Sequence, residues 1–269
     1  MMLLSFKGEP LVLHSILTTI FFDKIYGEEY SSLFARRLTA HEDISDQISK
    51  DIIYKLFILS AMFHDIGKAF KCYQQMEKSD ISFTYHELLS ACAVLRLFRK
   101  TFQSGGNYVP DEILYIFAAA VLMHHQAMRD LAEYHERINK GDLLRKLGSV
   151  LEIPDNADND FMILVNALKR YRISISVRDV KSSLDISIDN VRAVLDYLKD
   201  FLLCRKNIND TKIRHPYIWV AMVSVPIQLC DNLAASLIRP DASPLSSRMA
   251  YQALRYMDAK LKLKRKIVK

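Results

Sequence analysis

The segment AMFHDIGK, residues 61–68, decides how the rest of this 269-residue chain is interpreted. A mostly apolar stretch, residues 52–63, ends in the adjacent polar pair His64 and Asp65. Burying two polar side chains at such a place costs roughly 1–3 kcal/mol for each group that lacks a partner. A divalent cation is a suitable partner, because a neutral imidazole nitrogen and an ionised carboxylate oxygen both bind it. The alternative is a surface His-Asp pair at a helix end that Gly67 caps.

The composition is that of a helical globular protein. Half of the residues are hydrophobic, a quarter are charged, and seven are glycine and seven proline, which argues against disorder and a fibrous repeat. A chain of this length buries a large core, so we expect a single domain over residues 1–269. The formal net charge of +6 suits a polyanionic partner without requiring one.

Cysteine usage and the apolar runs favour a cytoplasmic protein. The cysteines form no CxxC motif and no close pair, so we expect neither disulfides nor a zinc–thiolate site; they are Cys72, Cys92, Cys204 and Cys230. Residues 1–10 lack the basic and apolar regions of a signal peptide. The longest apolar run, residues 113–123, is shorter than the ~20 residues that a membrane-spanning helix needs, so we expect no membrane contact.

Apolar periodicity predicts helices along most of the chain. The strongest patterns cover residues 11–26, 51–63, 85–102, 111–123 and 217–238, the last with a kink expected at Pro226. A short helix is expected around residues 33–38, and a C-terminal helix at 244–260. Ser82 and Thr84 are predicted as N-caps of the helix that carries His86. Residues 172–177 are the best candidate for a strand.

Residues 131–214 are richer in charge than the rest of the chain. Two helical patterns occur there, at 161–171 and 191–203, and we interpret the stretch as a helical insertion or lid on the core. Residues 176–200 have the pattern of a helix-turn-helix, with Asp189 placed to cap the second helix. Simple helix packing is the alternative to DNA reading by this segment.

Polar residues recur at the ends or in the first turns of the apolar helices. In chain order they are His14, the His64-Asp65 pair, His86, the His124-His125 pair and Asp231. Each has an ordinary explanation when taken singly, such as a satisfied core histidine for His14, or favourable charge at a helix C-terminus for the tandem histidines. Their joint occurrence in a chain with eight histidines favours one shared site. The other two histidines, His41 and His215, lie in polar stretches and are expected to face solvent.

This ordered set resembles the HD superfamily of metal-dependent phosphohydrolases. The tandem histidines and the HDxGK form of residues 64–68 are most similar to the HD nuclease of type I CRISPR interference. The resemblance covers roughly residues 11–130 and 218–238, without a counterpart in 131–214, and it implies an all-α HD-domain helical bundle. The chain contains neither a Gly-rich GKT/S loop nor a DEAD-like run. The resemblance therefore implies a stand-alone nuclease that acts with a separate helicase and a surveillance complex.

The resemblance also implies two adjacent divalent cations. His14, His64 and Asp231 would bind the first, His86, His124 and His125 the second, Asp65 would bridge both, and Lys68 would face the phosphate as a point charge. Two cations ~3.5–4 Å apart can hold the oxygens of a phosphodiester and lower the pKa of a bound water. Imidazole and carboxylate ligands without thiolate suit Mn, Fe, Co or Ni, and Mg is also allowed.

Three functional hypotheses follow from these residues. The first is a metal-dependent nuclease that cleaves single-stranded DNA in antiviral defence, helped by the basic residues at 260–269; a solvated basic end is the alternative for that tail. The second is a nucleotide or cyclic-nucleotide phosphohydrolase with a closed pocket. The third is a catalytically silent helical adaptor in a nucleoprotein complex, which predicts no bound transition metal.

Overall fold

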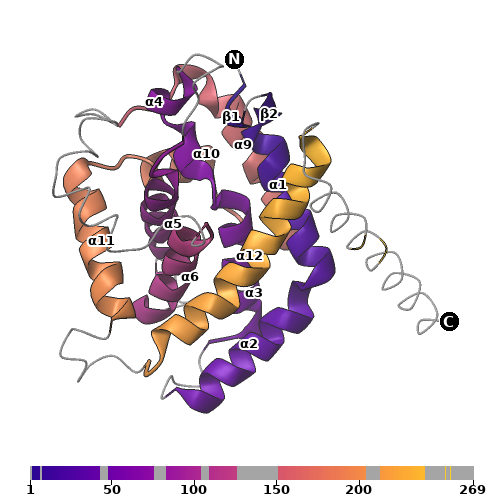
Figure 1. Ribbon diagram of the computed structural model, residues 1–269, viewed down its shortest axis with the longest axis vertical. Helices are drawn as coiled ribbons and strands as arrows, with labels where there is room; N and C mark the ends of the chain where they lie inside the picture. The colour runs from indigo at the N-terminus through magenta and orange to yellow at the C-terminus, as the bar shows by residue number, and fades with distance from the viewer. Residues whose placement is uncertain are drawn as a thin grey trace.

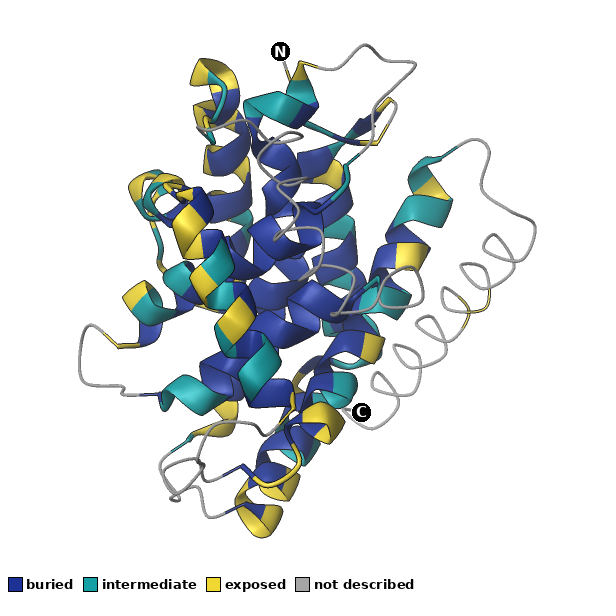
Figure 2. Cartoon of the chain, turned by 60° about the vertical axis from the view of Figure 1, so that its left-hand side comes forward, coloured by how far each residue is buried: buried dark blue, intermediate teal, exposed yellow. Residues whose placement is uncertain are grey.

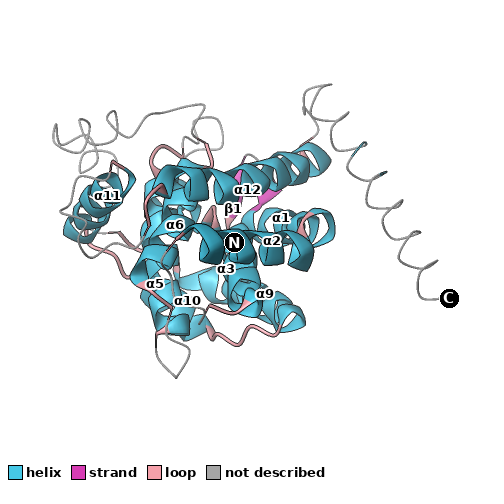
Figure 3. Ribbon diagram, turned by 90° about the horizontal axis from the view of Figure 1, so that it is seen from below, coloured by secondary structure: helices cyan, strands magenta, loops and turns pink. Residues whose placement is uncertain are grey.

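The described part of the chain is almost entirely helical (Figure 3). The computed structural model describes residues 2–6, 8–42, 48–75, 83–103, 109–125, 151–203 and 213–239, together with residues 252 and 255. Within these ranges the strands form one two-stranded antiparallel hairpin. The predicted all-α fold class is confirmed.

The elements follow the chain in the order shown in Figure 1. They are β1 (Leu4–Phe6), β2 (Glu9–Pro10), α1 (Leu11–Ile25), α2 (Gly27–His41), α3 (Lys50–Phe63), η1 (Ile66–Ala69), α4 (Lys71–Gln74), α5 (His86–Phe102), α6 (Asp111–Met123), η3 (Asp155–Ala157), α9 (Asp158–Leu168), η4 (Lys169–Tyr171), α10 (Val177–Ser183), α11 (Ile188–Leu202) and α12 (Pro216–Ile238).

Helices α3 and α6 form the centre of the bundle, because both are apolar on nearly every face. All residues from 113 to 123 in α6 are buried, and so are almost all of those from 52 to 63 in α3. Figure 2 shows this buried centre surrounded by helices that expose one side. An aromatic cluster around Phe57 fills it, with Phe117 at 4.9 Å and Phe22 at 5.0 Å between ring centroids.

Helix α12 crosses the bundle beside α1 and also packs on α6 (Figure 1). It continues through Pro226 as one 23-residue helix. Glu42, at the end of α2, accepts hydrogen bonds from Trp219 Nε1 and from the Arg214 N–H, both at 2.7 Å, and so fixes the start of α12. By length and composition α12 is a candidate membrane span, but 61% of its most apolar 18-residue window is buried in the bundle, as expected of a core helix.

The described part of the predicted insertion, residues 151–203, packs directly on the core. Leu164 of α9 and Leu198 of α11 are fully buried, and α10 and α11 lie against α5. Surface ion pairs join this segment to the core helices, including the pair of Lys100 in α5 with Asp179 in α10 at 2.7 Å. The assignment of 131–214 as an insertion or lid stays a prediction.

Several local predictions were wrong. The N-terminal hairpin was not expected, whereas residues 173–176 form no strand and Arg172 adopts a left-handed conformation with φ 57°. The helix predicted at 33–38 extends over the whole of α2, which begins at the left-handed Gly27 and carries Glu28 and Glu29 in its first turn, where the helix dipole favours acidic residues.

The predicted caps also differ from the structure. Ser187, with Asn190, forms the capping box of α11, and Asp189 lies in its first turn. Tyr85 is the N-cap residue of α5, in a left-handed conformation, in place of Thr84. Ser82, Cys204, nearly all of the predicted helix at 244–260 and the tail at 260–269 lie outside the described residues. The three cysteines that the structure describes are free.

Candidate metal centre

Helix ends bring three of the polar positions together. Helix α3 stops at Phe63, so His64 is its C-cap residue and Asp65 lies in the turn that follows. His86 is the first residue of α5, and His124 is the C-cap residue of α6. The start of α5 lies beside the end of α6, with the rings of His86 and His124 6.0 Å apart.

Gly67 is required by the close approach of η1 to α5. A Cβ atom at Gly67 would collide with the backbone oxygen of His86 and would lie 2.8 Å from the backbone nitrogen of Ser90. The Gly67 N–H instead donates to Ser90 Oγ at 2.8 Å. The glycine of the HDxGK sequence therefore lets the turn that carries Asp65 reach the histidine at the start of α5.

The first ligand group consists of His14, His64, Asp65 and Asp231. His14 Nε2 lies 2.9 Å from Asp231 Oδ1 and 3.3 Å from His64 Nε2. Asp65 Oδ2 lies 3.4 Å from His14 Nε2 and 3.6 Å from His64 Nε2. All four side chains are buried. Donors about 2.1 Å from one ion lie roughly 3.0–3.4 Å from each other, so the spacing of this group suits a single cation.

The second ligand group consists of Asp65, His86, His124 and His125. Asp65 Oδ1 lies 3.0 Å from His86 Nε2 and 3.6 Å from His124 Nε2. The His125 ring is 4.0 Å from the His124 ring and 5.4 Å from the His86 ring. One donor atom from each member lies within 4.8 Å of the others, as in the first group. His125 is the only member of either group that is partly exposed.

Unpaired atoms of the second group also fit a cation. Asp65 Oδ1, His86 Nε2 and His124 Nε2 are buried, and none of them makes a hydrogen bond of good geometry among the described residues, although Asp65 Oδ1 lies 3.0 Å from His86 Nε2. A buried polar atom without a partner costs roughly 1–3 kcal/mol, and the two Nε2 atoms lie 3.0 and 3.6 Å from Asp65 Oδ1. A metal ion placed among them would supply the missing interaction, and the donors are of the kind that divalent transition metals prefer.

Both carboxylates are held in the ionised form that a cation requires. Burial would raise the pKa of Asp65, but the charges of Lys68 and His64 outweigh it and hold this pKa well below its usual value. Burial likewise opposes ionisation of Asp231, but hydrogen bonds from His14 and His64 hold its pKa well below the usual value.

The histidines divide into protonated and neutral ones. Burial works against a charge on His14, but its contacts with Asp231 and Glu9 outweigh burial and raise its pKa to about 9. Burial, reinforced by the neighbouring His124, lowers the pKa of His125 to about 2. A proton on His14 would therefore have to leave before a cation could bind there, while His125 already offers a free lone pair.

The structure thus brings all seven predicted ligands into two adjacent groups that can each hold a metal ion. Lys68 is also there, with Nζ 2.6 Å from Asp65 Oδ2. His41 and His215 are exposed and lie outside the site, as expected. The roles of these residues as ligands and catalytic groups stay predictions.

Glu9 is a residue at the site that sequence reasoning missed. Its Oε1 lies 2.6 Å from His14 Nδ1, and its side chain is buried. The sequence around Glu9 carries no motif, because its place depends on the hairpin that folds back beside α1. A buried-strand prediction for residues 4–10 is the signal that would have drawn attention to it.

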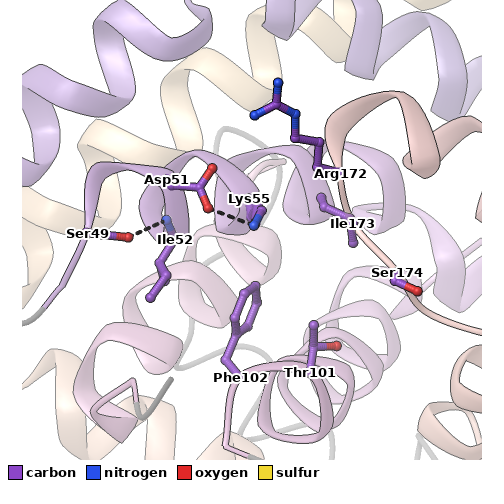
Figure 4. A pocket seen from close by; sticks show the side chains of 9 residues that line it. All are labelled: Ser49, Asp51, Ile52, Lys55, Thr101, Phe102, Arg172, Ile173 and Ser174. Atoms are coloured by element: carbon purple, nitrogen blue, oxygen red, sulfur yellow. Dashed lines mark hydrogen bonds and ion pairs between the residues drawn. The ribbon is translucent and has the colours of Figure 1, made fainter. Parts of the chain in front are cut away.

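A separate cavity of about 260 Å³ opens at the start of α3, the end of that helix opposite to His64 (Figure 4). Its polar groups are largely paired with each other: Lys55 with Asp51 at 2.7 Å, and Ser49 Oγ with the Ile52 N–H. Its lining contains no histidine or cysteine among the described residues.

Comparison with known proteins supports the fold. No protein-family model matches this sequence, and no curated protein matches it. Among solved structures, the chain is similar to the CRISPR-associated Cas3 HD domain protein MJ0384 from Methanocaldococcus jannaschii, with a TM-score of 0.54 and 21% sequence identity. The similarity covers 84% of this chain and 99% of that one. The expected resemblance to an HD domain of the CRISPR-associated kind is confirmed at the level of the fold.

Proposed function

We propose that this chain is a metal-dependent HD nuclease that hydrolyses phosphodiester bonds of single-stranded DNA in CRISPR interference. The observation that carries the proposal is the meeting of two ligand groups at one shared carboxylate, Asp65. It is supported by the fold shared with a CRISPR-associated Cas3 HD domain protein. A carboxylate shared by both groups would hold two cations close together, as a two-metal centre requires.

Two divalent transition-metal ions, when bound, would hold the phosphate oxygens, activate a water and neutralise the leaving oxygen. The chain contributes the placement: Asp65 offers Oδ2 to the first ligand group and Oδ1 to the second. His125, at the partly exposed edge, marks the side from which a phosphate reaches the centre. We assign the metals to Mn, Fe, Co or Ni, with Mg allowed, on the basis of the donor atoms.

Lys68 contacts Asp65 in this structure, and its Nζ lies 5.2 Å from the centroid of the Phe83 ring. A cation in the first ligand group would take over the neutralisation of Asp65. Lys68 would then be free to pair with the phosphate of the substrate, as a point charge does. We therefore assign it a catalytic role in binding the phosphate.

The partners follow from the same proposal. The net charge of +6 favours an anionic polymer, and single-stranded DNA would be presented by a separate helicase working with the surveillance complex. We place this activity in the cytoplasm.

Cleavage of single-stranded DNA with Mn²⁺ tests the proposal directly. The wild type and a His215→Ala control, which changes an exposed histidine remote from the site, should both cleave, and Asp65→Ala should not. Elemental analysis should find two equivalents of transition metal in the first two proteins and a clear loss in the third. Equal cleavage by all three proteins would overturn the proposal, and a wild type without metal would favour the silent adaptor.

The burial of the centre favours hydrolysis of small phosphate esters as a second candidate function. Six of the seven predicted ligands are buried, as a closed pocket for a nucleotide or cyclic nucleotide would require. Competition between nucleotides and an oligonucleotide separates the two functions. Inhibition of oligonucleotide cleavage by micromolar nucleotide, together with nucleotide turnover, would favour the second.

A further inference from the structure

We propose that Glu9 is a positioning residue for His14: it holds the imidazole so that Nε2 faces the first ligand group. The inference rests on the proposed function, because it takes His14 to be a metal ligand. A histidine can bind a metal through either ring nitrogen, and the partner of the other nitrogen decides which one is presented.

Three other histidines of the centre are oriented by the backbone. In each of them Nδ1 contacts the carbonyl oxygen of the residue three positions earlier. The contacts are His64 with Ala61 at 2.9 Å, His86 with Phe83 at 2.5 Å and His124 with Val121 at 2.5 Å. The Nε2 atoms of all three consequently face the ligand groups.

Their position at helix ends explains why these carbonyls are available. The last four carbonyls of a helix have no partner within it, and Ala61 and Val121 lie in the last turns of α3 and α6. Phe83 precedes α5 and lies outside any helix. The orientation of these ligands is therefore built into the place where each helix begins or ends.

His14 lies inside α1, where this arrangement is not available. The carbonyls of the preceding turn accept the N–H groups of the helix itself. An acceptor for Nδ1 has to come from another element, and β2 supplies it: Glu9 Oε1 lies 2.6 Å from His14 Nδ1. The carboxylate is 1% exposed, so water does not compete for the contact.

The second oxygen of Glu9 is also held. Arg239, at the C-terminal end of α12, donates from Nε to Glu9 Oε2 at 2.7 Å, and its guanidinium lies 4.4 Å from the centroid of the Phe6 ring. Arg239 compensates the buried charge of Glu9 and restricts its rotation. Arg239, Glu9 and His14 thus form a continuous chain of polar contacts that ends at Asp231.

The hairpin that carries Glu9 is fixed relative to the centre by separate contacts. The Leu3 N–H donates to Asp160 Oδ2 at 2.6 Å. Gln74 Nε2 donates to the carbonyl of Leu4 at 2.9 Å and to that of Lys68 at 2.6 Å. Asp160 therefore anchors the same hairpin without touching a ligand, which makes it a matched control.

The test compares Glu9→Gln with Asp160→Asn in the full-length protein. Mn²⁺ affinities of the two binding steps are measured by competition with a chelator. Glu9→Gln should weaken the step assigned to the first ligand group by roughly 10–100-fold, the range for outer partners of metal-bound histidines, and leave the other step unchanged. Asp160→Asn should leave both steps unchanged even where it lowers the thermal stability.

A spectroscopic measurement separates positioning from a loose hairpin. In the zinc-loaded, ¹⁵N-histidine-labelled protein, His14 should bind through Nε2, and the resonance of its Nδ1 proton should move when Glu9→Gln replaces the carboxylate by an amide. Arg239→Gln keeps the Glu9 carboxylate and should show a smaller loss of Mn²⁺ affinity at the step assigned to the first ligand group. It replaces Glu9→Gln as the test variant if Glu9→Gln does not fold.

The inference would be overturned if Glu9→Gln and Asp160→Asn weakened Mn²⁺ binding equally. It would also be overturned if neither Glu9→Gln nor Arg239→Gln changed the binding step assigned to the first ligand group. A wild type that binds two cations while Glu9→Gln has no effect overturns the role of Glu9 alone. A wild type that binds no cation overturns the proposed function as well.

Discussion

The two ligand groups that share Asp65 differ in charge and in exposure. The first group combines two carboxylates with two imidazoles, and all its members are buried. The second combines three imidazoles with the remaining oxygen of Asp65, and it includes the partly exposed His125. The donor distances are similar in the two groups: 2.9–3.6 Å in the first, and 3.0 and 3.6 Å from Asp65 Oδ1 to the Nε2 atoms of His86 and His124 in the second.

This difference indicates that the two groups would bind their cations with different affinities and leave them with different net charges. A divalent cation in the first group would be balanced by two carboxylates, so it would bind tightly and keep little charge for a substrate. A cation in the second group would keep a net positive charge, because imidazoles are neutral and Asp65 is shared. The second position is therefore suited to the anionic phosphate, and it also lies on the side that is less enclosed.

The largest effect is expected from Asp65→Asn, which removes the charge that both groups share. Both Mn²⁺ binding steps should weaken, and cleavage should fall by roughly 10²–10³-fold, the loss seen when one group that stabilises transition-state charge is removed. Isothermal titration and a cleavage assay measure the two effects. Loss of only one binding step would show that Asp65 does not join the two groups.

Single histidine variants should separate the two groups. His14→Ala should weaken the tighter Mn²⁺ binding step, which we assign to the first ligand group, and His125→Ala the weaker step, which we assign to the second. Each Mn²⁺ affinity should fall by more than the roughly 10–100-fold typical of outer partners of metal-bound histidines. His41→Ala, at an exposed histidine, should leave both steps intact. If His125→Ala removed the tighter step, the assignment of charge and affinity to the two groups would be reversed.

The sequence was sufficient for most of the helices, because apolar periodicity is a local pattern, whereas the grouping of the seven polar residues was implied by the resemblance of their ordered set to a known family. Apolar periodicity located α3 and α6, and the polar residues at their ends stood out against it. Helix-end positions were informative since α5 and α6, packed side by side, bring His86 and His124 together.

What the sequence could not supply are contacts that depend on the folded chain. Glu9 lies beside His14 only after the hairpin has formed, and no local pattern records that pairing. The N-cap position of α5 is taken by Tyr85, which is left-handed and fully buried, in place of the predicted Thr84. The need for glycine at position 67 likewise depends on the distance between η1 and α5.

Gly67→Ala should act on the second group more than on the first. The added Cβ meets backbone atoms of α5, so η1 has to move away from His86, at a cost of roughly 1–3 kcal/mol for overpacking. Urea unfolding and metal stoichiometry should show lower stability and loss of the weaker Mn²⁺ step. Gly27→Ala, at a residue with φ 54° and open space around it, is the control: about 1–2 kcal/mol of backbone strain with both steps retained. Equal metal loss in the two variants would contradict a local effect.

A change with pH should have opposite signs in the metal-free and metal-bound protein. Because the pKa of His14 is raised from 6.5 to about 9, its protonated form stabilises the metal-free fold fully below about pH 6.5 and loses that contribution as the pH rises through about 9. A cation in the first group has to displace this proton, so its affinity should rise over the same interval, by up to about tenfold per pH unit for one proton.

Thermal unfolding after chelator treatment and Mn²⁺ titration at matched pH values measure the two trends. Glu9→Gln removes one of the contacts that raise the pKa of His14, so it should make both trends smaller. Parallel trends in the two states would mean that His14 keeps its proton when metal binds, and the first ligand group would then lose one of its four members.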